Sequence, residues 1–98
     1  MIKVWLDDIR PMPAGYDVHC VDAASCIELL SRGCVSMISF DHDLGETGGT
    51  GYDVACWIEK AVASGTIAMP DWHIHSANPV GARNIELAMR STERFSQR

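Results

Sequence analysis

Three short apolar segments of this chain each end in a cluster of polar and ionisable residues, and this repeated arrangement limits the fold. The clusters are Asp7-Asp8 after residues 2–6, Asp41-His42-Asp43 after residues 35–40, and His75-Ser76-Ala77-Asn78 at the end of residues 72–76. Carboxylates are rarely buried without a partner, a metal ion or a chemical role. If the three segments are parallel neighbouring strands, the clusters meet at one edge of the sheet, where open α/β sheets bind ligands.

The rest of the chain supplies the helices that such a sheet requires. In order, we expect strands over residues 2–6 and 16–21, a helix over 23–32, a strand over 35–40, a helix over 52–63, a strand over 72–76, and a helix from residue 79. Favourable N-caps precede the three helices, namely Asp22, the capping-box pair Thr50 and Asp53, and Asn78 followed by Pro79. The polar tail over residues 91–98 is expected to fray. This order predicts an α/β sandwich with a mainly parallel sheet in a single domain, residues 1–98.

The composition excludes some classes of function and leaves others open. The formal net charge of −5 argues against a broad nucleic-acid surface, but it permits a small phosphorylated ligand held by a few local donors. No apolar run is long enough to cross a membrane, and the N-terminal residues lack a signal-peptide pattern. The four cysteines show no C-x-x-C spacing, which favours buried thiols in a reducing compartment over a zinc site. We therefore expect a cytoplasmic protein without a membrane partner, and the sequence leaves its oligomeric state open.

Four aspartates at two of the predicted strand ends could supply several oxygen ligands at one place. They are Asp7, Asp8, Asp41 and Asp43. Oxygen ligands suit a hard cation such as Mg²⁺ or Mn²⁺, which keeps several coordinated waters and also binds phosphate oxygens. Without a cation, clustered carboxylates would repel one another and raise at least one pKa. The alternative for Asp7 and Asp43 individually is that each caps a turn, but turn capping explains four converging carboxylates poorly.

Two histidines beside these carboxylates are candidates for acid–base catalysis. His42 lies between two aspartates, and His75 precedes Ser76 and Asn78. A histidine near its ordinary pKa of about 6.5 can give or take a proton at neutral pH. One histidine could serve the attacking water and the other the leaving alkoxide of a phosphodiester. The alternative for either histidine is an ordinary polar residue with satisfied hydrogen bonds.

The segment after His75 is a candidate phosphate site. Ser76 and Asn78 precede a helix whose first free N–H groups point back toward the strand ends, and such a helix terminus attracts anions. Arg83 in that helix, or Arg10 after the first aspartate pair, could clamp a phosphate oxygen. The alternative for both arginines is a solvated surface position. The Gly-rich segment 45–51 matches neither a P-loop nor a dinucleotide fingerprint.

Four motifs together resemble the receiver superfamily of response regulators, and more closely its offshoot, the cyclic-phosphate processing receiver domain. They are LDDIRPMP at residues 6–13, SFDHDLG at 39–45, GYD at 51–53 and HSANPVG at 75–81. The resemblance implies a small three-layer, flavodoxin-like sandwich of about four mainly parallel strands. It matches Asp7 and Asp8 to the acidic pair that holds Mg²⁺ and Asp41 to the phosphoacceptor. Ser76-Ala77 matches the Ser/Thr-Ala pair after the fourth strand.

Departures from an ordinary receiver change the function that the resemblance implies. Receivers use a lysine after a fifth strand, whereas this sequence shows one helix after the fourth strand and carries only Lys3 and Lys60. We therefore expect a fold truncated relative to a full receiver, in which phosphorelay is disfavoured. A Pro-rich loop also replaces the usual first helix. The histidines, absent from typical receivers, match the offshoot family, for which processing of cyclic phosphates has been proposed.

Two hypotheses from different classes follow. The first is a metal-assisted phosphoesterase that acts on a cyclic phosphate or cyclic-nucleotide phosphodiester, with His42, His75 and Asp41 as catalytic residues. The second is a non-catalytic, degenerate receiver-like module that binds a phosphorylated ligand or a partner protein. The histidine pair distinguishes the two hypotheses, because binding alone does not require it.

Overall fold

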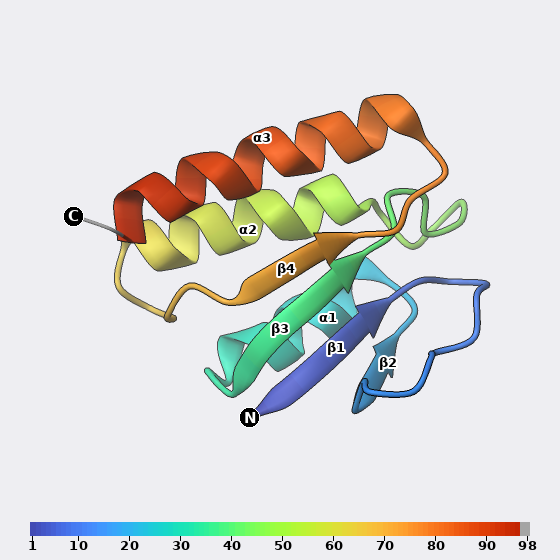
Figure 1. Ribbon diagram of the computed structural model, residues 1–98, viewed down its shortest axis with the longest axis horizontal. Coiled ribbons are helices and arrows are strands. Elements are labelled where there is room, and N and C mark those ends of the chain that lie inside the picture. Colours follow the sequence, from blue (N-terminus) through green and yellow to red (C-terminus); the bar gives the residue numbers. More distant parts are fainter. Residues whose placement is uncertain (97–98) are drawn as a thin grey trace.

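The computed structural model describes residues 1–96 and shows one four-stranded sheet with three helices (Figure 1). In chain order the elements are β1 (Ile2–Leu6), β2 (Val18–Cys20), α1 (Ala23–Ser31), β3 (Val35–Phe40), α2 (Gly51–Ala63), β4 (Asp71–Ile74) and α3 (Pro79–Ser96). The strands lie in the order β2-β1-β3-β4, and each pairing is parallel. The predicted α/β class, the parallel sheet and the likeness to a small receiver fold are confirmed.

Side-chain caps fix the starts of the three helices. Oδ1 of Asp22 accepts a hydrogen bond at 2.8 Å from the backbone of the third residue of α1. Thr50 and Asp53 form the predicted capping box at α2. Oδ1 of Asn78 accepts a hydrogen bond at 3.0 Å from the backbone of the third residue of α3. Each cap satisfies N–H groups that the start of a helix leaves unpaired, so the predicted helix starts are confirmed to within one residue.

The last helix is longer than the sequence predicts, because its tail is amphipathic. Instead of fraying from residue 91, α3 continues to Ser96. Thr92 is fully buried, and its hydroxyl donates to the carbonyl of Ala88 at 2.8 Å. Thr92 thereby extends the buried stripe of Ile85 and Met89 at helical spacing. The prediction of a frayed tail is wrong up to residue 96, and residues 97–98 lie outside the described part of the chain.

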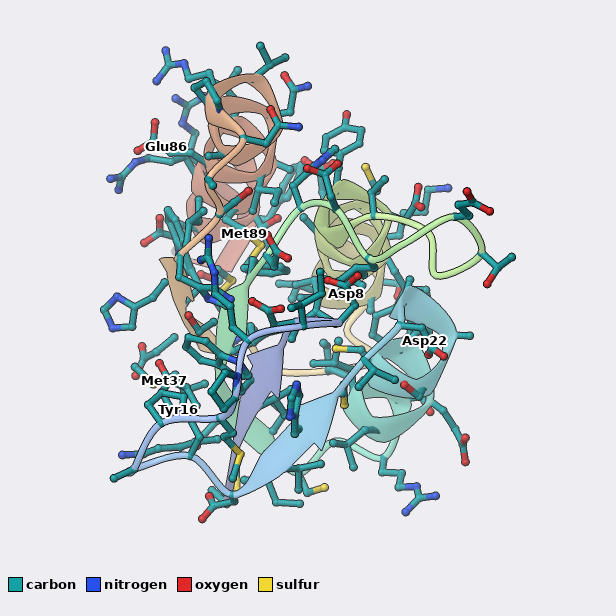
Figure 2. The ribbon with its side chains drawn as sticks, turned by 90° about the vertical axis from the view of Figure 1, so that its right-hand side faces the viewer. Asp8, Tyr16, Asp22, Met37, Glu86 and Met89 are labelled. Carbon is teal, nitrogen blue, oxygen red and sulfur yellow. The ribbon has the colours of Figure 1, made fainter. Side chains whose placement is uncertain are left out.

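The helices of residues 1–96 all pack on one face of the sheet, so the predicted third layer is wrong (Figures 1 and 2). Helix α2 packs against both α1 and α3. The crossovers β2-α1-β3 and β3-α2-β4 advance across the sheet in the same direction, and right-handed crossovers then place both helices on one face. The connection that runs back, from β1 to β2, is the Pro-rich loop of residues 7–17. On this second face Tyr16 and Met37 remain partly accessible (Figure 2).

The hydrophobic core lies between the sheet and the helices. Its fully buried large side chains come from β1, β3 and each helix, and include Val4, Leu6, Leu30, Ile38, Phe40, Val54, Ile58, Ile85 and Met89. Each such side chain contributes about 1.5–3 kcal/mol when it leaves water. None of the helices in residues 1–96 is long and apolar enough to cross a membrane.

The register of the sheet brings the three polar clusters together at its carboxyl edge, as predicted. Leu6 of β1 pairs with Phe40 of β3, which also pairs with the last residue of β4. Just beyond the strands, the N–H of Asp41 donates to the carbonyl of Leu6 and the N–H of His75 to the carbonyl of Phe40, both at 2.9 Å. Asp7, Asp41 and His75 therefore follow three adjacent strands. Strand β4 ends two residues earlier than predicted, so His75 lies just outside it.

Candidate active site

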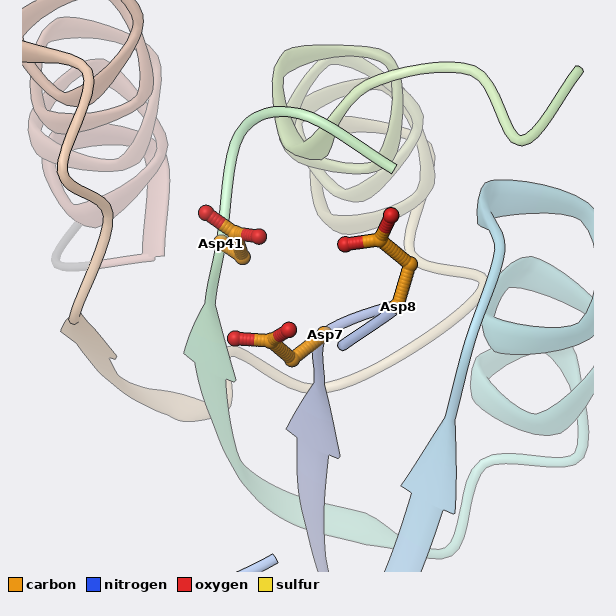
Figure 3. A group of neighbouring side chains, drawn as sticks. All are labelled: Asp7, Asp8 and Asp41. Atoms are coloured by element: carbon orange, nitrogen blue, oxygen red, sulfur yellow. The ribbon is translucent and has the colours of Figure 1, made fainter. Parts of the chain in front are cut away.

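Three carboxylates converge at the carboxyl edge of the sheet (Figure 3). One oxygen from each of Asp7, Asp8 and Asp41 lies within 4.8 Å of the other two. Asp7 and Asp8 follow β1 and Asp41 follows β3, so the parallel pairing of these strands creates the cluster. Of the four aspartates predicted to hold a metal ion, Asp43 lies outside this cluster, because its carboxylate bonds a histidine and an amide instead.

Asp7 is the buried member of the cluster and is held by three hydrogen bonds. Its side chain is 1% exposed. Oδ1 accepts from the N–H groups of Ile9 and Arg10, each at 2.8 Å, and Oδ2 lies 3.0 Å from Nε2 of His75. Burial alone would raise the pKa of Asp7, but the backbone hydrogen bonds and His75 together outweigh burial and lower the pKa. Asp7 is therefore an ionised carboxylate in a fixed orientation.

The pKa of Asp41 is shifted upward, in the opposite direction to that of Asp7. Burial raises the pKa of Asp41 and the negative charge of Asp7 raises it further, against hydrogen bonds from the N–H of His42 at 2.9 Å and from Ser76. Such repulsion between carboxylates is relieved when a divalent cation binds between them. Carboxylate oxygens are also the ligands that Mg²⁺ and Mn²⁺ prefer. The cluster of Asp7, Asp8 and Asp41 thus fits a divalent cation.

His75 is enclosed by Asp7, Ser39 and Trp5. Its Nε2 contacts Asp7, and its Nδ1 lies 2.7 Å from Oγ of Ser39. The ring of Trp5 stacks on the imidazole, with centroids 3.7 Å apart and planes inclined by 6°. Burial lowers the pKa of His75, although Asp7 opposes this shift. Because both ring nitrogens are engaged, the predicted acid or base role of His75 requires one of these contacts to break.

His42 makes its side-chain hydrogen bonds through one nitrogen. Nδ1 lies 3.1 Å from Oδ1 of Asp43 and 3.4 Å from the amide nitrogen of Asn78. Hydrogen bonds from His42 and then from Asn78 lower the pKa of Asp43. The ring packs on the first turn of α3 at Gly81, where a Cβ atom would lie 2.2 Å from it. Within residues 1–96, no hydrogen bond reaches Nε2 of His42.

A pocket of about 370 Å³ opens beside the carboxylates, in the size range of small-molecule sites. Its wall consists of Asp7, Asp8, Ile9, Arg10, Asp41, Asp43, Gly45, Ala77 and Asn78. Ile9 is 83% exposed and adds an apolar side chain to a largely charged wall. His42 and His75 are not among these wall residues. The carboxylates therefore face the pocket directly, whereas the histidines contact them from outside its wall.

Two of the four residues predicted to bind phosphate reach the pocket. Asn78 lines it, although its side chain also caps α3 and donates to Oδ2 of Asp43 at 3.2 Å. Arg10 lines the pocket too, and its guanidinium donates to the carbonyl of His75. Both groups retain further N–H donors that a phosphate oxygen could accept from.

The other two residues predicted to bind phosphate lie outside the pocket wall. The hydroxyl of Ser76 bonds the carboxylate of Asp41 and accepts from the N–H of Asn78 at 3.1 Å, so it holds the turn between β4 and α3. Arg83 is exposed and pairs with Glu86 at 2.7 Å on the surface of α3. Its predicted phosphate contact has no support in this arrangement.

The site also contains three residues that the sequence did not single out: Trp5, Ser39 and Ile9. Trp5 pairs with Ser39 across β1 and β3, and both precede an aspartate by two residues. Because side chains two apart in a strand share a face, this spacing was the available signal for both. No sequence signal pointed to Ile9.

Comparison with known families identifies one related family. A family model described as "Cyclic-phosphate processing Receiver domain" matches residues 2–91. The match includes all four strands and each of the site residues described above. Comparisons with curated proteins and with solved structures gave no match.

Proposed function

Because the chain belongs to the family of cyclic-phosphate processing receiver domains, we propose that it is a metal-assisted phosphoesterase that opens a cyclic phosphate ester. One observation carries the proposal: three carboxylate oxygens lie within 4.8 Å of one another beside a pocket of about 370 Å³. The pocket also contains an arginine and an amide. This combination supports joint binding of a divalent cation and a small phosphorylated ligand, such as a cyclic nucleotide.

Asp7, Asp8 and Asp41 would hold the cation, which we propose to be Mg²⁺ or Mn²⁺. When bound, such an ion polarises a phosphoryl oxygen and makes a coordinated water more acidic. The chain contributes carboxylates that are already oriented. Asp7 is fixed by three hydrogen bonds, and Asp41 by the N–H of His42 and the hydroxyl of Ser76. Ligands held in this way need little reorganisation when the ion binds.

The chemistry requires one proton transfer that the chain can provide. Hydrolysis adds water to phosphorus, breaks one P–O bond of the ring and moves a proton from the water to the leaving oxygen. We assign this transfer to His42, whose Nδ1 bonds Asp43. A carboxylate on one imidazole nitrogen orients the ring and sets its tautomer. His75 could share the transfer only by giving up its contact with Ser39 or Asp7.

The ligand itself would be small and phosphorylated. Asn78 and Arg10 line the pocket and offer N–H donors to phosphate oxygens, while Ile9 offers an apolar contact to the organic part. The formal net charge of −5 disfavours a broad nucleic-acid surface, so we propose a ligand bound by local contacts.

A binding module without turnover is the second candidate, and the histidine contacts favour it. Both nitrogens of His75 are engaged, and neither histidine lines the pocket. A site that only binds a phosphorylated ligand or a phosphorylated partner protein needs no free acid or base. Turnover separates the two candidates.

We also propose a cytoplasmic location. Cys20, Cys26, Cys34 and Cys56 are all free thiols, and two of them are buried. Free buried thiols are typical of proteins from a reducing compartment. Fractionation of the native host would test this location.

The proposed function is tested by incubating the purified protein with cyclic mononucleotides, cyclic dinucleotides and RNA that carries a cyclic-phosphate end. We expect turnover with Mn²⁺ and none with EDTA. Asp41→Asn should abolish turnover, whereas Asp71→Asn should not, because Asp71 is an exposed carboxylate at the opposite end of β4. Binding without turnover would favour the second candidate. Turnover that resists both EDTA and Asp41→Asn would reject the metal-assisted mechanism.

A further inference from the structure

Ser39 is a buried polar residue to which the proposed reaction gives no direct role. It lies in β3 and is 2% exposed. Its Oγ is 2.7 Å from Nδ1 of His75, and on the other side of the ring Nε2 is 3.0 Å from Oδ2 of Asp7. A chain of hydrogen bonds thus runs from the interior of the sheet to the carboxylate cluster.

The chemistry of these groups fixes the positions of the protons. A carboxylate only accepts hydrogen bonds, so Nε2 of His75 carries the hydrogen shared with Asp7. The hydroxyl of Ser39 has one proton, and within residues 1–96 its hydrogen-bond partner is Nδ1. In the neutral ring Nδ1 then carries no hydrogen, so the hydroxyl donates, Nδ1 accepts, and the ring is the Nε2–H tautomer. The opposite tautomer would turn the lone pair of Nε2 toward the carboxylate of Asp7.

The ring of His75 is also clamped mechanically. Trp5 stacks on it, and the indole N–H of Trp5 donates to the carbonyl of Arg10 at 3.2 Å. The guanidinium of Arg10 in turn donates to the carbonyl of His75. These contacts prevent the imidazole from turning. Nε2 therefore stays beside Oδ2 of Asp7, and it donates a hydrogen bond to that oxygen only when it carries a hydrogen.

We infer that Ser39 is a positioning residue for Asp7, because its hydroxyl bonds Nδ1 of His75 and holds the ring where Nε2–H reaches Oδ2 of Asp7 in the carboxylate cluster. The inference rests on the proposed function, since it concerns how the chain orients a carboxylate toward a cation. Two backbone N–H groups already hold Oδ1. With both oxygens anchored, the carboxylate cannot rotate, and its remaining acceptor capacity is directed at the cluster. Hydrogen bonds that orient a metal-binding residue, made by groups that do not themselves bind the metal, change metal affinity by about 10–100-fold.

Two measurements test the inference, one of them in the metal-free protein. Nitrogen-15 NMR of His75 reports the tautomer, and titration with Mn²⁺ reports the affinity of the cluster. We expect the Nε2–H tautomer in the parent protein. Ser39→Ala leaves Nδ1 of His75 without its donor, which should shift the Nδ1 resonance and weaken Mn²⁺ binding by about 10-fold. Ser39→Thr keeps the hydroxyl and should restore the parent Nδ1 resonance and the parent Mn²⁺ affinity.

Ser36→Ala is the matched control. It removes a hydroxyl from the same strand, and that hydroxyl bonds the carbonyl of Ile2 at 3.3 Å, away from the site. The nitrogen-15 spectrum of His75 and the Mn²⁺ affinity should therefore not change. An Nδ1–H tautomer in the parent, or equal Mn²⁺ affinity of the parent and Ser39→Ala, overturns the inference. The predicted tautomer together with a shifted Nδ1 resonance in Ser39→Ala, without any Mn²⁺ binding, would support the hydrogen-bond chain while rejecting the proposed metal-assisted function.

Discussion

Gly81 offers a sharp test of how His42 is built into the site. A Cβ atom on Gly81 would lie 2.2, 2.5 and 2.6 Å from Cγ, Cδ2 and Nδ1 of His42. These distances are far inside normal carbon contacts of about 3.5–4.0 Å. Gly81→Ala must therefore move the imidazole, and with it the contacts of Nδ1 to Asp43 and Asn78.

Two opposing effects set the size of the change in stability. Inside a helix, alanine is favoured over glycine by about 1 kcal/mol, so the substitution alone would stabilise α3. Overpacking by one methyl group typically costs about 1–3 kcal/mol. Gly81 is buried and the side chain of His42 is only 17% exposed, so the ring has little room to yield. We expect the clash to prevail, with a net loss of about 1 kcal/mol in the free energy of unfolding.

A double-mutant cycle isolates the clash. His42→Ala removes the three ring atoms, so in that background Gly81→Ala should raise the free energy of unfolding by up to about 1 kcal/mol. The two backgrounds should then differ by about 2 kcal/mol, which denaturant titration resolves. The same effect of Gly81→Ala in both backgrounds would refute the placement of His42 against α3.

Three further predictions concern a cap, a carboxylate and the last helix. Asp22→Ala should lower the free energy of unfolding by about 1 kcal/mol at pH 7. Since hydrogen bonds from Ser25 lower the pKa of Asp22, this loss should shrink as the pH falls below 3.8 toward that lowered pKa, and a loss that does not shrink on acidification would contradict it. Asp41→Asn should raise the melting temperature of the metal-free protein, because burial and the charge of Asp7 raise the pKa of Asp41 and make its ionisation unfavourable in the folded state. The rise should grow as the pH increases from 3.8 to the raised pKa of Asp41 and then level off, and the further rise that Mn²⁺ gives the parent should be absent. Thr92→Asp should destabilise the protein by about 3 kcal/mol or more in thermal melts, because it buries a charge, whereas a frayed tail would tolerate it.

Local sequence signals predicted much of the fold and failed where the outcome depended on packing. Strands β1 and β3 match the predicted residues 2–6 and 35–40, because each is a short apolar run that ends in charged residues. The third layer was taken from the receiver resemblance, although Pro11 and Pro13 already excluded a helix on the second face. The buried Thr92 looked polar in the sequence, but its hydroxyl bonds its own helix and can enter the core.

The carboxylate cluster was predictable because strand order decides which chain segments meet. Asp7 and Asp41 follow adjacent parallel strands, and that information is contained in the pattern of apolar runs. The direction in which an individual side chain points is not contained in that pattern. Asp43 turns away from the cluster to its sequence neighbour His42, and Ser39 reaches His75 only because β3 and β4 pair in one register.

The two histidines look equivalent in the sequence, yet their surroundings predict different defects when each is removed. His75 bonds a member of the carboxylate cluster, so His75→Ala should weaken cation binding, and excess Mn²⁺ should restore most of the turnover. His42 bonds Asp43, outside the cluster, so His42→Ala should reduce the chemical step by roughly 10²–10⁴-fold at every Mn²⁺ concentration. Rate measurements across a Mn²⁺ titration compare the two variants directly. Recovery of His42→Ala by Mn²⁺, or failure to recover His75→Ala, would reverse this division of roles.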